Sequence, residues 1–327
     1  MNRERLIAAF LDRHGYGTAR AEPLAQDASF RRYLRLSGGP APAVLMDAPP
    51  PEDVRPFLRI AGHLRTIGVS APEIFAADEA TGLLLEEDLG DEPVAQECLA
   101  LADLIAAADL LVTIQRAAPP PNLPAWDAAT MAATALGTLF DWWWPAMFGA
   151  DAPAAARQDF AAALEAMLAP VAAGPVCFVH RDFFAGNLHW LPQRDGVRRI
   201  AVIDFQNAAI GHPAYDLASL LQDARRDIPP VLAECVMSHY LATQAGCDAA
   251  AFRAAYAACA AQRHLRIAGQ WVRLARRDGR PGYLNHGPRT WRLLQQAVRE
   301  PVAAPLAAAL DRWIPPERRC NPPGLAA

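Results

Sequence analysis

The chain has 327 residues, enough for one large domain or two medium ones, and 53% of them are apolar, which excludes wholesale disorder. The formal net charge is −4 and the arginines are dispersed, so we expect neither nucleic acid nor an anionic membrane as a partner. No apolar run approaches the ~18 residues of a membrane span, and no signal peptide is recognisable. The six cysteines include no C-x-x-C pair, so we expect them to be small buried residues in a reducing compartment, and the protein to be cytoplasmic.

The first 90 residues alternate between helical and strand patterns. Apolar side chains recur at helical spacing over residues 3–14, and a second helix is expected from Glu52 to about Ile67. Short apolar runs separated by turn sequences predict strands over residues 30–36, 43–46, 73–77 and 83–87. These elements form one small, sheet-rich lobe.

Beyond residue 90 the pattern becomes mostly helical. Alanine-rich helices are expected at about 98–116, 128–147 and 154–172, and again from residue 216 to the C-terminus. Two short runs rich in Val, Phe and Ile, residues 175–179 and 200–204, read as buried strands. We therefore predict an α+β chain with a β-rich N-lobe (residues 1–90) and a larger helical C-lobe (residues 91–327), and a ligand in the crevice between them.

The strongest chemical motif directly follows the first of these strands. It reads His180-Arg181-Asp182, and Asn187 comes five positions after the aspartate. Asp182 can accept a proton from a hydroxyl that attacks a γ-phosphate, while Asn187 and Asp204 offer the oxygen ligands that Mg²⁺ prefers. The plainer reading makes these residues loop caps, but the strand-Asp-Phe run 22 residues later favours a phosphoryl-transfer site.

These segments resemble the aminoglycoside phosphotransferase/choline kinase family. The likeness rests on residues 179–188, 203–205 and 211–221 and extends over nearly the whole chain. It implies a protein-kinase-like bilobal fold that uses ATP and Mg²⁺ to phosphorylate small-molecule hydroxyls. By this resemblance Asp182 is the base, and Asn187 and Asp204 are metal ligands.

The resemblance also implies supporting and nucleotide-binding positions. Asp216 corresponds to a structural acid behind the catalytic loop, whose shape His180 and Arg181 support. Glu87 and Leu89 fall in the hinge between lobes, whose backbone meets adenine.

A narrower resemblance points to the acceptor. Residues 27–33, 44–50, 204–208 and 262–265 are similar to bacterial anomeric kinases of N-acetylmuramate and N-acetylglucosamine, which act in peptidoglycan recycling. The implied acceptor is the anomeric hydroxyl of an N-acetylated amino sugar. Asn207 stands where aspartate is more usual, which puts its contacts to the sugar or metal in doubt.

The chain contains no lysine, although the family normally holds the nucleotide phosphates with a strand lysine. Met46 occupies the corresponding position and has no charge. The turn that ends at Arg31 and Arg32, and that includes Ser29, occupies the place of the phosphate-covering loop. Strand alternation puts the two arginines on opposite faces, so we expect one of them to contact the phosphates. Two alternatives stay open: both arginines could be solvated edge residues, or Mg²⁺ and backbone amides could bind the phosphates without a side-chain cation.

The acceptor-binding residues are the least constrained. Trp143 belongs to a run of three tryptophans that could stack on a sugar or pack in the core, and Arg263 could meet a carboxylate or lie on a solvated helix face. Two rival functions stay open. One is a kinase for another hydroxyl acceptor such as an aminoglycoside, and the other is a regulatory pseudokinase, which the missing lysine favours and the intact Asp182 opposes.

Overall fold

The computed structural model describes residues 2–24, 31–90, 100–244 and 246–325. Within it the chain forms two compact units, residues 1–99 with 186–207 and residues 100–185 with 208–327. The sequence indicates a single division near residue 90, whereas the chain returns to the first unit over 186–207. No helix among the described residues is long and apolar enough to cross a membrane.

The first unit is built on an antiparallel sheet. Its strands are β1 (Arg20–Pro23), β2 (Arg32–Ser37), β3 (Ala43–Asp47), β4 (Ile74–Asp78) and β5 (Leu83–Glu87), in the order β1-β2-β3-β5-β4. The turn into β5 requires Gly82, which has a φ of +69° and whose added Cβ would lie 1.9 Å from the Ala48 carbonyl oxygen. The register pairs Tyr33 with Met46 and Met46 with Leu84.

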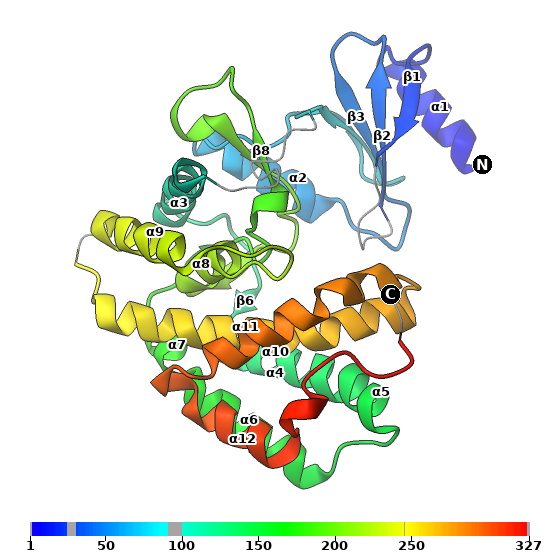
Figure 1. Ribbon diagram of the computed structural model, residues 1–327. Coiled ribbons are helices and arrows are strands. Elements are labelled where there is room, and N and C mark those ends of the chain that lie inside the picture. Colours follow the sequence, from blue (N-terminus) through cyan, green and yellow to red (C-terminus); the bar gives the residue numbers. More distant parts are fainter. Residues whose placement is uncertain (1, 25–30, 91–99, 245, 326–327) are drawn as a thin grey trace. The chain divides into compact units, whose positions relative to one another are not determined.

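One face of this sheet is covered by helix α1 (Arg3–Arg13), which lies beside β1 and β2 in Figure 1. Phe10 and Leu11 of α1 share a buried cluster with Leu36, Leu45 and Leu85. Because side chains alternate along a strand, the residues on either side of Leu45, Val44 and Met46, face the other way. The same unit holds α2 (Arg55–Thr66) and a hairpin of β8 (Leu188–Trp190) and β9 (Ile200–Val202).

The second unit is mostly helical. Its helices are α3 (Leu101–Arg116), α4 (Ala128–Thr138), α5 (Trp144–Phe148), α6 (Ala154–Met167), α7 (Ala169–Ala173), α8 (Ala214–Leu221), α9 (Pro230–Thr243), α10 (Ala249–Arg277), α11 (Gly287–Ala297) and α12 (Ala304–Trp313). A π-helical segment, Leu139–Trp143, joins α4 to α5. Strands β6 (Ala125–Trp126), β10 (Ala209–Gly211) and β7 (Cys177–Val179) form a small sheet in that order.

The long helix α10 is the centre of this unit, and α11 runs along it in Figure 1. Most of its residues are buried, including polar ones. At Gly269 the approach is so close that an added Cβ would lie 2.2 Å from the Thr138 carbonyl oxygen. A helix packed on several sides buries its arginines as well as its alanines, which matters for the site described below.

Several details differ from the sequence-based expectations, and the helices expected at 128–147 and 154–172 are each divided into shorter segments. Helix α2 begins at Arg55, so Glu52 and Asp53 precede it instead of forming its first turn. The short strands β6, β8 and β10 were not predicted. Among the described cysteines only Cys259 is buried, while Cys235, Cys247 and Cys320 are exposed, so the expectation of buried cysteines was wrong for these three.

Candidate active site

The backbone of the 180–182 loop is fixed by one buried carboxylate. The amides of His180 and Arg181 donate to the two oxygens of Asp216, at 2.6 and 2.9 Å, from the first turn of α8. Arg181 adopts a φ of +75°, a conformation in which non-glycine residues carry strain. The amide of Asp182 donates to Nδ1 of His180 at 3.3 Å, and Asp182 as a whole residue is partly buried.

Asp216 is fully buried, and this burial raises its pKa to about 7. The bonds from His180 and Arg181 oppose the rise, as does the positive charge of Arg263, whereas Asp182 adds to it. Both oxygens of Asp216 already accept an N–H, so the geometry suits the ionised form. The backbone conformation of the 180–182 loop therefore depends on the ionised Asp216 carboxylate, whose charge is destabilised by burial.

The two expected metal ligands come together in the first unit. The amide of Ile203 donates to the carbonyl oxygen of Asn187 at 3.0 Å, which continues the β8–β9 pairing to the residue before Asp204. Asp204 adopts a φ of +60°, and Gln206 Nε2 donates to its Oδ1 at 2.6 Å. Mg²⁺ in proteins usually takes only one or two ligands from the protein and the rest from phosphate and water. An amide oxygen and a carboxylate on adjoining chain segments are suitable ligands of this kind, so these residues fit the ion.

The segment after Asp204 is anchored by an aromatic contact. Phe205 is fully buried, and its ring stacks on Phe57 of α2 with a centroid separation of 4.8 Å. The buried ring holds the backbone at Asp204, whose side chain is less buried.

Arg31, Glu86 and Met46 lie on the same face of the sheet, because Glu86 pairs with Val44 and Arg31 is two residues from Tyr33, the partner of Met46. Arg31 is 7% exposed, and its Nε donates to Glu52 at 3.1 Å. Its charge also acts on Tyr33 and Glu86. Glu86 is 5% exposed, and burial raises its pKa to about 8, against the opposing effect of Arg31. A guanidinium therefore stands near the position where the sequence lacks a lysine.

Arg32 is oriented differently. Its guanidinium pairs with Asp47, which also receives the guanidinium of Arg3 from α1. Asp47 and Leu45 are two residues apart on β3, so Arg32 belongs to the α1 face of the sheet.

The other predicted nucleotide contacts are described only in part. Ser29 lies outside the described residues. The Glu87 carboxylate pairs with Arg194, and the backbone amide of Glu87 donates to the backbone carbonyl oxygen of Glu73 at 2.8 Å. Leu89 is partly exposed and precedes Gly90, which has a φ of +79°.

The three predicted acceptor contacts differ in their surroundings. Trp143 is fully buried, packs on Trp291, and donates its indole N–H to the Cys320 carbonyl at 3.0 Å, so its side chain belongs to the helical core. Arg263 is 1% exposed, so the solvated-face alternative was wrong. Asn207 is exposed in a turn.

Three residues with polar groups near these positions were not anticipated: Glu52, Glu86 and Trp126. Glu86 had a visible signal, because it is an acidic residue inside the apolar run of β5. The others are brought in by tertiary packing, and no local pattern marks them.

A sheet-containing unit and a helical unit that carries an Asp-bearing loop define a kinase-like fold. Comparison with solved structures agrees. A choline/ethanolamine kinase family protein from Mesorhizobium loti superposes with a TM-score of 0.62 at 18% identity, covering 95% of this chain and 100% of that one. The choline kinase LicA from Streptococcus pneumoniae, solved in complex with AMP, gives a TM-score of 0.63 at 15% identity. The match covers 93% of this chain and 98% of that one. These likenesses confirm the predicted fold class.

Sequence comparison identifies the family. Residues 20–250 match the phosphotransferase enzyme family, and the chain belongs to it. It is similar to the N-acetylmuramate/N-acetylglucosamine kinase of Caulobacter vibrioides, with 37% identity over 97% of this chain and 98% of that protein. The enzyme of the same name from Pseudomonas aeruginosa is 35% identical over 88% of this chain and 87% of that protein. The resemblance inferred from the motifs is therefore confirmed.

Proposed function

We propose that this enzyme transfers the γ-phosphate of ATP, with Mg²⁺, to the anomeric hydroxyl of N-acetylmuramate or N-acetylglucosamine. The observation that carries the proposal is the pair of bonds that the His180 and Arg181 amides donate to Asp216, which fix the backbone directly before Asp182, a residue that is only partly buried. The near full-length similarity to the Caulobacter vibrioides kinase supports the acceptor.

Asp182 acts as the general base in this proposal. It takes the proton of the acceptor hydroxyl as that oxygen attacks the phosphorus. An anomeric hydroxyl is more acidic than an ordinary alcohol, so a carboxylate is an adequate base and charge stabilisation carries most of the rate. The backbone bonds of His180 and Arg181 to Asp216 orient Asp182 without contacting substrate.

Asn187 and Asp204 would hold Mg²⁺, which when bound neutralises phosphate charge and aligns the β- and γ-phosphates. The bond from Gln206 orients the Asp204 carboxylate. Arg31 takes the phosphate-binding role of the absent lysine, kept in place by Glu52. The backbone of Glu87 and Leu89 contacts the adenine.

An ADP-coupled assay over a panel of N-acetylmuramate, N-acetylglucosamine, aminoglycosides and choline tests the proposal, with Asp182→Asn as the background control. We expect turnover with the two N-acetylated sugars and a product whose phosphorus couples to the anomeric proton in NMR. Turnover only with an aminoglycoside or choline would refute the acceptor, and near-native turnover by Asp182→Asn would refute the base.

A further inference from the structure

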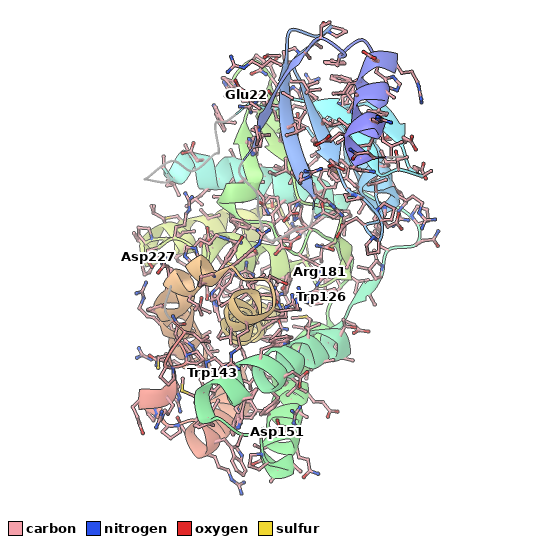
Figure 2. The ribbon with its side chains drawn as sticks, turned by 90° about the vertical axis from the view of Figure 1, so that its right-hand side faces the viewer. Glu22, Trp126, Trp143, Asp151, Arg181 and Asp227 are labelled. Carbon is pink, nitrogen blue, oxygen red and sulfur yellow. The ribbon has the colours of Figure 1, made fainter. Side chains whose placement is uncertain are left out.

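A cluster of cationic side chains surrounds Trp126 in the second unit. Arg181 stacks over the indole ring at 3.8 Å from its centroid, and Figure 2 shows the two side by side. Arg263 and Arg266 lie three positions apart on α10, so they point from one face of that helix. Arg266 lies 6.0 Å from the Trp126 ring and donates to the hydroxyl of Tyr215 at 3.5 Å.

Several donors of this cluster have no acceptor. Within the described part of the chain, Nε and Nη1 of Arg263, Nε of Arg266 and the indole N–H of Trp126 are buried without a hydrogen-bond partner. Arg263 is 1% exposed and Trp126 2%. A buried cationic donor without an acceptor is strongly unfavourable, and folded proteins normally pair such groups. The second unit therefore offers several buried N–H donors to a ligand that carries acceptor oxygens.

The nearby carboxylates do not accept hydrogen bonds from these donors. Asp216 bonds the backbone of the catalytic loop through both oxygens. Asp223 accepts the amide of Arg225 through Oδ1 at 2.8 Å. Its Oδ2 forms no hydrogen bond with the cluster and lies 3.5 Å from Nε of Arg226 in an ion pair. Arg181, which stacks on Trp126, directly precedes Asp182 in the chain, so the cluster lies near the proposed base.

The side-chain groups without partners are all N–H donors, so a ligand that binds them must offer acceptor oxygens. The positive charges of Arg263 and Arg266 favour an anionic ligand. A guanidinium fork matches the planar geometry of a carboxylate. We propose that Arg263, Arg266 and Trp126 form a carboxylate-binding subsite for the acceptor beside Asp182. This inference rests on the proposed function. It implies that the enzyme favours N-acetylmuramate, which carries a carboxylate on its lactyl ether, over N-acetylglucosamine, which has none.

Arg266→Gln is the primary test, because Arg266 is partly exposed and its loss leaves the more deeply buried Arg263 in place. With N-acetylmuramate we expect kcat/KM to fall about 10- to 100-fold, mostly through KM, because one charge-assisted contact is lost. With N-acetylglucosamine the change should stay below about threefold, and Arg266→Lys should recover part of the loss. The matched control is Arg253→Gln, which removes one charge from a surface pair on the same helix and should leave the ratio of the two kcat/KM values unaltered.

Equal losses on both sugars, or no loss on either, would overturn the subsite. A rise in the KM for ATP that is the same with both acceptors would assign the cluster to nucleotide phosphate and also overturn it. Failure of the proposed function looks different, because the wild-type enzyme would then turn over neither sugar. D-Lactate gives an independent readout: it should inhibit N-acetylglucosamine phosphorylation by the wild-type enzyme, and Arg266→Gln should relieve that inhibition. Lactate inhibition equal in both proteins would also contradict the assignment.

Discussion

Replacing Arg31 by alanine tests how the enzyme binds phosphate without a lysine. The Arg31 side chain is 8% exposed, and its Nε bond to Glu52 already restricts it, so little conformational entropy remains to be lost on binding ATP. A charge-assisted bond to phosphate is worth about 1.5–3 kcal/mol. We therefore expect kcat/KM for ATP to fall about 10- to 150-fold in Arg31→Ala.

The assay is ADP-coupled turnover with ATP varied at saturating acceptor, and thermal unfolding verifies that each variant is folded. Arg32→Ala is the matched control, because Arg32 pairs with Asp47 on the α1 face and its side chain is 59% exposed. Its effect on kcat/KM for ATP should stay within about threefold. A folded Arg31→Ala enzyme with kcat and KM for ATP within about twofold of wild type would refute the reasoning.

A double variant separates the charge of Arg31 from its role in packing. Tyr33 pairs with Met46 across β2 and β3, so a lysine at position 46 lies on the same sheet face as Arg31. Arg31→Ala/Met46→Lys should recover about tenfold of the loss in kcat/KM, because it restores a cation at the usual strand position. No recovery in a folded double variant would show that the guanidinium position itself is required.

The remaining predictions concern buried groups. Asp216→Asn replaces one of the two acceptor oxygens with an amide donor, so the backbone amide of His180 or Arg181 loses its partner. We expect the free energy of unfolding in denaturant to fall by about 1–3 kcal/mol and kcat to fall as well. An unaltered kcat would contradict the positioning role of Asp216. Glu86 has a pKa of about 8 when folded and 4.5 as its ordinary value, so the folded state binds the extra proton and stability falls as pH rises from about 4.5 to 8, by on the order of 5 kcal/mol at most. Glu86→Gln should flatten that fall, measured as the free energy of unfolding against pH, and an unaltered slope would mean that Glu86 is ionised throughout. Trp143→Ala should cost about 3–5 kcal/mol in unfolding without a selective rise in acceptor KM, whereas a selective rise would return Trp143 to the acceptor site.

The sequence was most informative where function restricts both residue type and spacing. The interval from Asp182 to Asn187 and the apolar run before Asp204 predict a loop and a buried strand, and both elements are present. The strands β6, β8 and β10 are only two or three residues long, too short for alternation to be recognised.

The surroundings of individual side chains were much harder to predict. Arg263 looked like a solvated residue because helical spacing says which side chains share a face but not what packs on that face. The tryptophan run looked adaptable, but a π-helical segment, Leu139–Trp143, precedes α5 and turns Trp143 into the core. Tertiary packing decides both cases, and it is not encoded within a short window of sequence.

The shared partner of Arg3 and Arg32 has a practical consequence for protein production. Arg3 bonds Asp47 and the Thr81 carbonyl, so the start of α1 is tied to the end of β3, one residue beyond Met46. A purification tag fused ahead of Asn2, which caps α1, adds chain at the point where that tie is made. Kinetic constants for ATP are therefore best measured on protein carrying its tag at the other terminus.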